Sequence, residues 1–247
     1  MFVNGLRFAQ SELSITGADL TLTTNEAGAS IEIIGLPTIV SGGSSSPTTA
    51  WDFNPPHAAD FELIDDGTHL TLSDDADIGL CIYGGAARTG DWVRAAIEAA
   101  PAGDFSFSAK ISINAFNGNY AGAGICVYDA TAANRIVLFK SSLYSGSTSI
   151  EVSYFNFPSG FNSNPFSIQQ FSASDGGWYK ITRASGLLSF FYSRDGKNWN
   201  AMALNVSQTD WLTNGVTHVG FGAWYNRAAG TPSADVNFSV SCLTKSW

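Results

Sequence analysis

The chain of 247 residues has few charged residues and few basic ones in particular. Charged residues make up 13% of it, and 12 lysines and arginines stand against 21 acidic residues, which gives a net charge of −9. Proteins that bind the nucleic-acid backbone need clustered Lys and Arg side chains to replace condensed counterions. No such cluster occurs, so we expect no nucleic-acid partner, and an anionic membrane surface is disfavoured for the same reason.

Long apolar runs and paired cysteines are also missing. No stretch of about 18 apolar residues could span a bilayer, and the opening MFVNGLRFAQSELSITG lacks the basic and apolar regions of a signal peptide. Cys81, Cys126 and Cys242 lie far apart in apolar stretches. We therefore expect buried free thiols in a chain folded in a reducing compartment, and no zinc site of the C-x-x-C kind.

The chain is rich in aromatic residues and glycine, with 17 Phe, 8 Tyr, 7 Trp and 25 Gly. Short runs with period-two alternation recur after residue 51, as in FSFSAKISI at 105–113, and such alternation is typical of strands with one buried face. The alanines of DWVRAAIEAA (91–100) favour helix, but the segment is short and lies between strands, so we predict a strand. The pattern predicts an all-β fold, a two-sheet antiparallel sandwich of jelly-roll type.

The first fifty residues differ from the rest. ADLTLTT and ASIEII flank NEAG and predict a small β-hairpin, which is marginally stable alone in water. SGGSSSPTT reads as a linker. We therefore predict an N-terminal attachment hairpin at 1–40, a Gly/Ser linker at 41–50 and the sandwich at 51–247.

The segment LLSFFYSRDGKNW carries a strong hairpin signal. Asp195-Gly196 stands between two strand patterns, and such turns need the positive φ that glycine adopts freely. We therefore interpret Asp195 as a turn residue rather than as a catalytic acid or base.

The same segment carries a resemblance to a known family. GWYKITRASGLLSFFYSRDGKNWNAM followed by HVGFGAW resembles a pattern of the concanavalin A-like lectin/glucanase superfamily, including its laminin-G-like members, over residues 177–224. WDFNPPHAADFELIDDGTHLTLSDDADIGLCIY is similar to the start of uncharacterised sandwich proteins of tailed bacteriophages and prophages. The resemblance implies a concanavalin A-like sandwich and a location in a virion assembled in the host cytoplasm.

The resemblance also directs attention to enzymes, because glucanases of that superfamily carry carboxylates alternating along one strand. The acidic clusters here, at 65–66 and 73–77, read as solvated turns, and Glu151 stands alone on its strand pattern. Tyr179 and Lys180 are adjacent and would point to opposite faces, unlike the paired residues of the superfamily's lyases. We expect no enzyme and no cofactor, although the oxygen ligands of DDAD would suit Ca²⁺.

Two segments combine the aromatic rings and amides that recognise sugars. They predict a glycan-binding site at strand ends, with Trp224 also suited to core packing, and consist of Asn117, Asn119, Tyr120, Trp224, Tyr225, Asn226 and Arg227. A third segment, YFNFPSGFNSNPF, embeds Phe155, Phe157, Phe161 and Phe166 among polar residues. These rings either fold over the sandwich or form a subunit interface.

Together these patterns predict a non-enzymatic structural or adhesive virion protein. It would attach to other virion proteins through residues 1–50 and display a sandwich that binds cell-surface glycans. The resemblance implies a homo-oligomer, with a trimer as the usual state of such spikes. The alternatives are a stand-alone carbohydrate-binding lectin-like module and a glycoside hydrolase or polysaccharide lyase.

Overall fold

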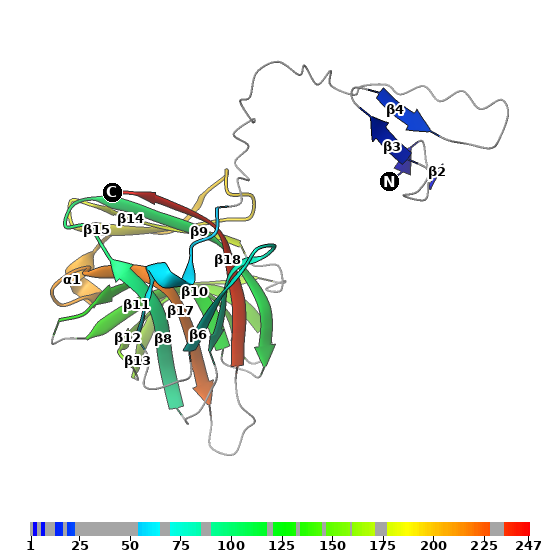
Figure 1. Cartoon of the computed structure of the whole chain (residues 1–247). Coiled ribbons are helices and arrows are strands. Elements are labelled where there is room, and N and C mark those ends of the chain that lie inside the picture. The colour runs from blue at the N-terminus through cyan, green and yellow to red at the C-terminus, as the bar shows by residue number, and fades with distance from the viewer. Residues whose placement is uncertain are drawn as a thin grey trace. The chain divides into compact units, whose positions relative to one another are not determined.

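The computed structural model describes residues 2–3, 6–7, 13–16, 19–22, 54–64, 70–84, 90–117, 121–131, 134–144, 147–158, 160–170, 177–227 and 235–247, and structural statements refer to these. The chain forms two compact units, Met1–Pro47 and Thr48–Trp247 (Figure 1).

The N-terminal unit contains two short strand pairs. Strand β1 (Phe2–Val3) pairs with β2 (Leu6–Arg7), and β3 (Leu13–Thr16) pairs antiparallel with β4 (Asp19–Leu22). The first strand of the predicted hairpin overlaps β4, whose partner here is the preceding β3. The predicted second strand, at 29–34, lies outside the described residues.

The second unit is a sandwich of two seven-stranded antiparallel sheets, which confirms the predicted fold class. The first sheet has the order β13-β12-β11-β10-β17-β8-β5. Its strands are β5 (Glu62–Ile64), β8 (Gly90–Ala99), β10 (Ala121–Asp129), β11 (Arg135–Tyr144), β12 (Ser147–Asn156), β13 (Phe161–Gln170) and β17 (His218–Arg227).

The second sheet has the order β16-β15-β14-β9-β18-β7-β6. Its strands are β6 (Leu70–Asp75), β7 (Gly79–Gly84), β9 (Phe105–Asn117), β14 (Gly177–Ala184), β15 (Leu187–Ser193), β16 (Asn200–Ser207) and β18 (Asp235–Ser246). A 3-10 turn, η2 (Ala58–Asp60), precedes β5, and the four-residue helix α1 (Gln208–Trp211) follows β16. In the described part of the chain, no helix has the length and apolarity needed to cross a membrane.

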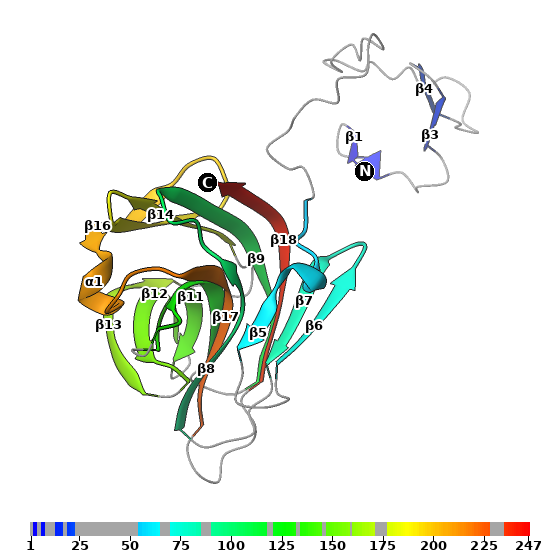
Figure 2. The same ribbon diagram turned by 60° about the vertical axis from the view of Figure 1, so that its left-hand side comes forward.

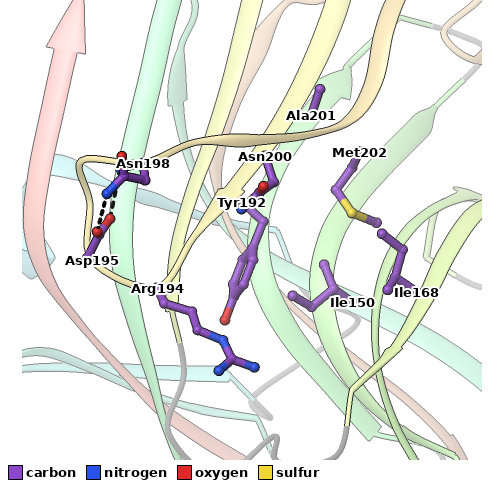
Figure 3. A pocket seen from close by; sticks show the side chains of 9 residues that line it. All are labelled: Ile150, Ile168, Tyr192, Arg194, Asp195, Asn198, Asn200, Ala201 and Met202. Carbon is purple, nitrogen blue, oxygen red and sulfur yellow. Dashed lines mark hydrogen bonds between the residues drawn. The ribbon is translucent and has the colours of Figure 1, made fainter.

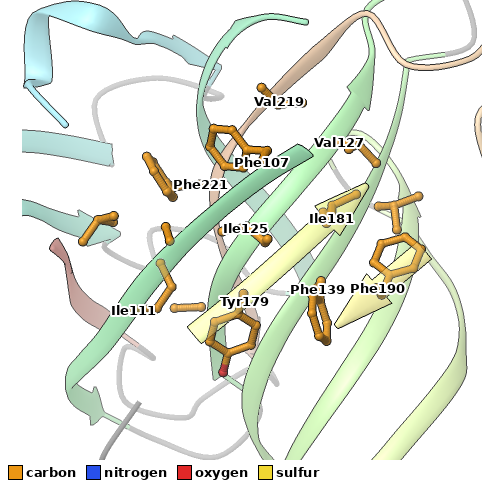
Figure 4. Close-up of a cluster of buried hydrophobic side chains, with 14 of the residues drawn as sticks. Phe107, Ile111, Ile125, Val127, Phe139, Tyr179, Ile181, Phe190, Val219 and Phe221 are labelled. Carbon is orange, nitrogen blue, oxygen red and sulfur yellow. The ribbon is translucent and has the colours of Figure 1, made fainter. Parts of the chain in front are cut away.

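The main core fills the space between the sheets. Alternate residues of β9, such as Phe107 and Ile111, point into it, and the Phe107 ring packs against Phe221 of the facing sheet (Figure 4). The rings pack at angles: Phe139 and Tyr179 have centroids 5.1 Å apart in an edge arrangement. Such pairs add roughly 0.5–1.5 kcal/mol to the free energy of burial.

Strand β8 confirms the strand prediction for the alanine-rich segment. Residues Val93 to Ile97 are all buried, because Ala96 faces the main core while Val93, Ala95 and Ile97 belong to a second apolar cluster on the opposite face. A strand covered on both faces shows no apolar–polar alternation, which explains why its sequence resembled a helix.

The first sheet is strongly curved, and we call it the curled sheet. The backbone N–H of Val93, on β8 near one edge, donates a hydrogen bond of 2.9 Å to the carbonyl of Pro158, which follows β12 near the other edge. Figure 2 shows its strands arranged in an arc. The face of this sheet directed away from the second sheet is therefore an enclosed concave face, packed with the second apolar cluster.

Candidate functional site

The two segments predicted to bind a glycan meet at one end of the sandwich. Asn117 ends β9, and β10 begins at Ala121, whose cross-strand partner is Tyr225. Asn119 and Tyr120 lie outside the described residues, and so does the side chain of Arg227. Asn226 is partly exposed, at the end of β17.

Tyr225 lies within β17 and is buried, which corrects its predicted place at the end of a strand. Strand β17 continues through this residue, the ring is 1% exposed, and its hydroxyl accepts a hydrogen bond of 2.6 Å from Nη2 of Arg94. Trp224 is also buried, on the concave face of the curled sheet. Its burial agrees with the core-packing alternative, and the glycan-binding role of this segment stays a prediction.

Trp224 adjoins a buried charge pair. Lys140 on β11 and Glu151 on β12 are direct cross-strand partners, with Nζ 2.6 Å from Oε2 and with side chains only 1% and 8% exposed. Nζ also donates to Oγ of Ser153 and lies 4.6 Å from the centre of the Trp224 ring. The strand pattern indicated that Glu151 stands alone, but in the structure it is paired with Lys140 on the neighbouring strand. Each charge of this pair is therefore compensated by the other in the interior.

A glycine makes room for this pair. A Cβ atom on Gly122 would lie 2.8 Å from Cδ of Lys140 and 2.8 Å from the carbonyl oxygen of Ser141. The lysine stem thus lies flat over the bare backbone of β10, close to Trp224, the cross-strand partner of Gly122.

The four phenylalanines of the predicted interface mostly pack onto their own domain. Phe155 is fully buried on the concave face, Phe157 contacts Tyr128 at 5.6 Å between ring centres, and Phe166 packs against Trp211. Only Phe161, of these four, is exposed, by 42%, with its ring against Phe155. Three of the four rings therefore fold over the sandwich, which was one of the two predicted alternatives.

A pocket of about 490 Å³ lies where β12 and β13 of the curled sheet meet β15 and β16 of the second sheet. Small-molecule sites in proteins commonly have volumes of about 300–1,000 Å³. The pocket in this protein is lined by Ile150, Ile168, Tyr192, Arg194, Asp195, Asn198, Asn200, Ala201 and Met202 (Figure 3). We call it the edge pocket.

The lining of the edge pocket has an apolar side and a polar side. Ile150, Ile168 and Met202 gather on one side, and Ile168 is 51% exposed although it is an isoleucine (Figure 3). Asn198, Asn200 and Arg194 supply amide and guanidinium groups, all on exposed residues. The Tyr192 ring lies between the apolar side and the polar side, and it makes an edge contact with the buried Tyr179, with ring centroids 5.4 Å apart.

Asp195 shapes this rim through the turn that the sequence predicted. Its Oδ1 accepts hydrogen bonds from the backbone N–H groups of Lys197 and Asn198 and from Oγ of Ser193, and its Oδ2 accepts one from Nδ2 of Asn198. These donors, the Asn198 backbone first, hold the pKa of the carboxyl well below its usual value of 3.8. Gly196 follows with φ of +71°, as the turn requires. The hairpin prediction is confirmed.

Sequence reasoning did not find the edge pocket. Its residues come from two hairpins in different sheets, and only Asp195 among them had been considered as a functional residue. One signal was available: an asparagine within the turn, Asn198, and another directly after it, Asn200. The acidic turn at 73–77 is built as expected, with Oδ1 of Asp75 accepting from the N–H groups of Asp77 and Ile78. Among the described residues, no three His, Cys, Asp or Glu side chains are grouped to hold a metal ion.

No family model and no curated protein matches this chain. Solved structures do: a functionally unknown protein from Saccharomyces cerevisiae has a TM-score of 0.51 at 14% identity, over 78% of this chain and 100% of that one. A mutant of the GH43 protein BlXynB from Bacillus licheniformis has a TM-score of 0.52 at 16% identity, over 77% of this chain. The carbohydrate-binding module CBM66 from Bacillus subtilis has a TM-score of 0.43.

At these identities the similarity concerns the fold. The chain covers only 37% of the GH43 protein, so it shares its architecture with one part of that enzyme. The comparisons therefore show a shared β-sandwich fold, and a fold alone does not determine function.

Proposed function

We propose that the sandwich is a non-catalytic carbohydrate-binding module whose ligand occupies the edge pocket. One observation carries the proposal: a pocket of about 490 Å³ that combines an apolar side with a rim of amides and a guanidinium group. A pyranose ring has the matching surfaces, because its C–H faces are apolar while its edge carries hydroxyl groups.

Each side of the pocket has a defined part in this proposal. Ile168 and Met202 would cover the C–H face of a sugar, and the exposed area of Ile168 would then leave water. Asn200 offers both a donor and an acceptor to neighbouring hydroxyls. The occurrence of the fold in part of a GH43 protein agrees with a carbohydrate ligand.

The carboxylates of the described residues support a binding role rather than a hydrolytic one. A glycosidase needs two carboxyl groups flanking the scissile bond, about 5–10 Å apart. The edge pocket has one, Asp195, and both of its oxygens are occupied by the turn. Glu151, on the strand that lines the pocket with Ile150, points to the opposite face and is paired with Lys140.

The proposal is tested by calorimetric titration with the sugars that bind the intact chain on a glycan array. We expect Ile168→Ala and Asn200→Ala each to weaken binding severalfold. Leu204→Ala removes an equally exposed apolar residue of β16, and Asn164→Ala an exposed asparagine of β13, and neither residue lines the pocket. Equal effects of the pocket variants and these controls, or a silent array at high protein concentration, would contradict the proposal.

The virion location and the placement among concanavalin A-like sandwiches are further parts of the proposal. They rest on the sequence resemblance, and the separate compact unit Met1–Pro47 supports a tethering role for the N-terminus. The intact chain should then sediment with phage particles, while a chain without residues 1–47 should remain in the supernatant. In light scattering the purified intact chain should be a homo-oligomer, expected to be a trimer. Equal sedimentation of both chains would contradict attachment through the N-terminus.

A further inference from the structure

We infer that the edge pocket selects a carboxylated sugar, such as a uronic or sialic acid, and that Arg194 binds its carboxylate. The inference rests on the proposed function and adds the chemical class of the ligand. It follows from the state of Arg194, from the charges around it and from the apolar side of the same pocket.

Arg194 is a cation without a partner among the described residues. Its side chain is exposed, lines the pocket and extends beside the ring of Tyr192 (Figure 3). It forms no hydrogen bond, ion pair or ring contact within the part of the chain that the structure describes. Other arginines of the sandwich are engaged: Arg183 donates to the backbone carbonyls of Gly103 and Val216, and Arg94 to Tyr225.

The neighbouring carboxylate does not neutralise Arg194 by direct contact. Asp195 directs its oxygens into the turn, where they accept four hydrogen bonds from Ser193, Lys197 and Asn198. The lining contains no other acidic residue, since the neighbouring strands contribute Ile150 and Ile168. The turn itself carries two cations, Arg194 and Lys197, against the single anion Asp195.

The guanidinium group fits a carboxylate better than it fits a hydroxyl. Its planar fork can donate two parallel hydrogen bonds to the two oxygens of a carboxylate, and such charge-assisted bonds are about twice as strong as neutral ones. A small inorganic anion would use the guanidinium alone. A sugar acid also uses the apolar surface of Ile168 and Met202, so the two sides of the pocket together favour the carboxylated sugar.

The net charge of the protein is negative and repels anionic ligands at long range. With a net charge of −9, long-range attraction cannot explain a preference for an acidic ligand. At an ionic strength near 0.15 M the Debye length is about 8 Å, so titrations under that condition report chiefly local contacts.

The experiment titrates the intact chain with tri-galacturonic acid, with the neutral galactotriose and with N-acetylneuraminic acid, and includes acetate and inorganic phosphate as small anions. We expect one carboxylated sugar to bind at least about tenfold more tightly than galactotriose, and the small anions to bind far more weakly. Comparison of the affinities for tri-galacturonic acid and N-acetylneuraminic acid shows whether the pocket prefers a uronic acid or a sialic acid. Arg194→Gln should abolish the preference, because it should lower the affinity for the acidic sugar at least about tenfold and lower the affinity for the neutral sugar much less.

Lys197→Gln is the matched control, because it removes one positive charge from the same turn at an exposed residue outside the pocket lining. It should retain the preference for the acidic sugar. Equal affinities for acidic and neutral sugars, or equal losses in Arg194→Gln and Lys197→Gln, overturn the inference while the proposed function stands. Absence of binding by every sugar overturns the proposed function, and the inference with it.

Discussion

Replacing Glu151 by glutamine removes the charge partner of Lys140 from the concave face of the curled sheet. In the structure Nζ of Lys140 lies 2.6 Å from Oε2 of Glu151, and the two side chains are 1% and 8% exposed. Glutamine preserves the shape: its oxygen, in place of Oε2, can still accept from the hydroxyl of Ser142, and its amide nitrogen, in place of Oε1, can donate to Oγ of Ser149. The substitution therefore tests the charge and little else.

The loss of stability arises because the charge of Lys140 stays buried without its partner. Breaking a buried pair by removing one partner typically costs about 3–5 kcal/mol, because the other charge is left without compensation in a medium of low polarity. In Glu151→Gln the ammonium group of Lys140 keeps its contacts with Ser153 and the face of Trp224 but loses the negative charge that compensates it. We expect a loss of about 3–5 kcal/mol, and a similar loss for Lys140→Met, out of a total stability of about 5–15 kcal/mol.

The double variant separates the pair from its surroundings. With Lys140→Met and Glu151→Gln combined, neither side chain of the pair is charged, and methionine can lie over Gly122 as the lysine stem does. Replacing a whole buried pair by groups of similar volume is often neutral. We therefore expect the double variant to be more stable than either single variant, which corresponds to a coupling energy of several kcal/mol.

The same pair predicts a pH dependence. Burial acts to raise the pKa of Glu151, but the charge of Lys140 and the hydrogen bonds from Lys140, Ser149 and Ser142 outweigh it, so the pKa lies below its ordinary value of 4.5. A carboxyl with a lowered pKa in the folded state adds stability above its unfolded pKa, and this stability disappears as pH falls from 4.5 through the folded value. Glu151→Gln should lose less stability over that range than the unsubstituted protein.

Urea unfolding followed by tryptophan fluorescence and far-UV circular dichroism measures all four proteins at pH 7 and at intervals below pH 5. Additive losses in the double variant would refute the argument, because they would show that the two charges are each satisfied independently. So would an unchanged pH dependence in Glu151→Gln.

Three further predictions concern packing and thiol reactivity. Trp211→Ala should lower the free energy of unfolding by about 3–5 kcal/mol, because this buried ring joins three aromatic neighbours between the sheets, whereas the exposed Trp247→Ala should cost far less. Gly196→Ala should cost about 1–2 kcal/mol or more by the same measurement, since alanine is strained at φ of +71° and its Cβ would lie 2.8 Å from an indole ring. Iodoacetamide should modify the partly exposed Cys81 before Cys126, whose burial raises the pKa of the thiol, and mass spectrometry of the native protein would contradict this if Cys126 reacted first.

The fold was predictable because its determinants are local. Period-two alternation along 105–113 gave the face of β9 that enters the core, and Asp195-Gly196 gave the β15–β16 hairpin. The strand prediction for 91–100 succeeded only through its length and neighbours, because a strand buried on both faces carries no periodic signal.

The charge pair and the edge pocket were not predictable because they depend on register and on sheet order. Lys140 and Glu151 face each other only when β11 and β12 pair in one register, and a shift by one residue would send them to opposite faces. Ile168 and Arg194 share a pocket only because β13 and β16 are the edge strands on the same side of the sandwich. Sequence patterns determine which strands exist and which faces are apolar, whereas the arrangement of edges follows from how two complete sheets stack. A ligand site formed between such edges can thus be recognised only after the topology is known, and here that topology turns an arginine beside a turn into the candidate specificity determinant.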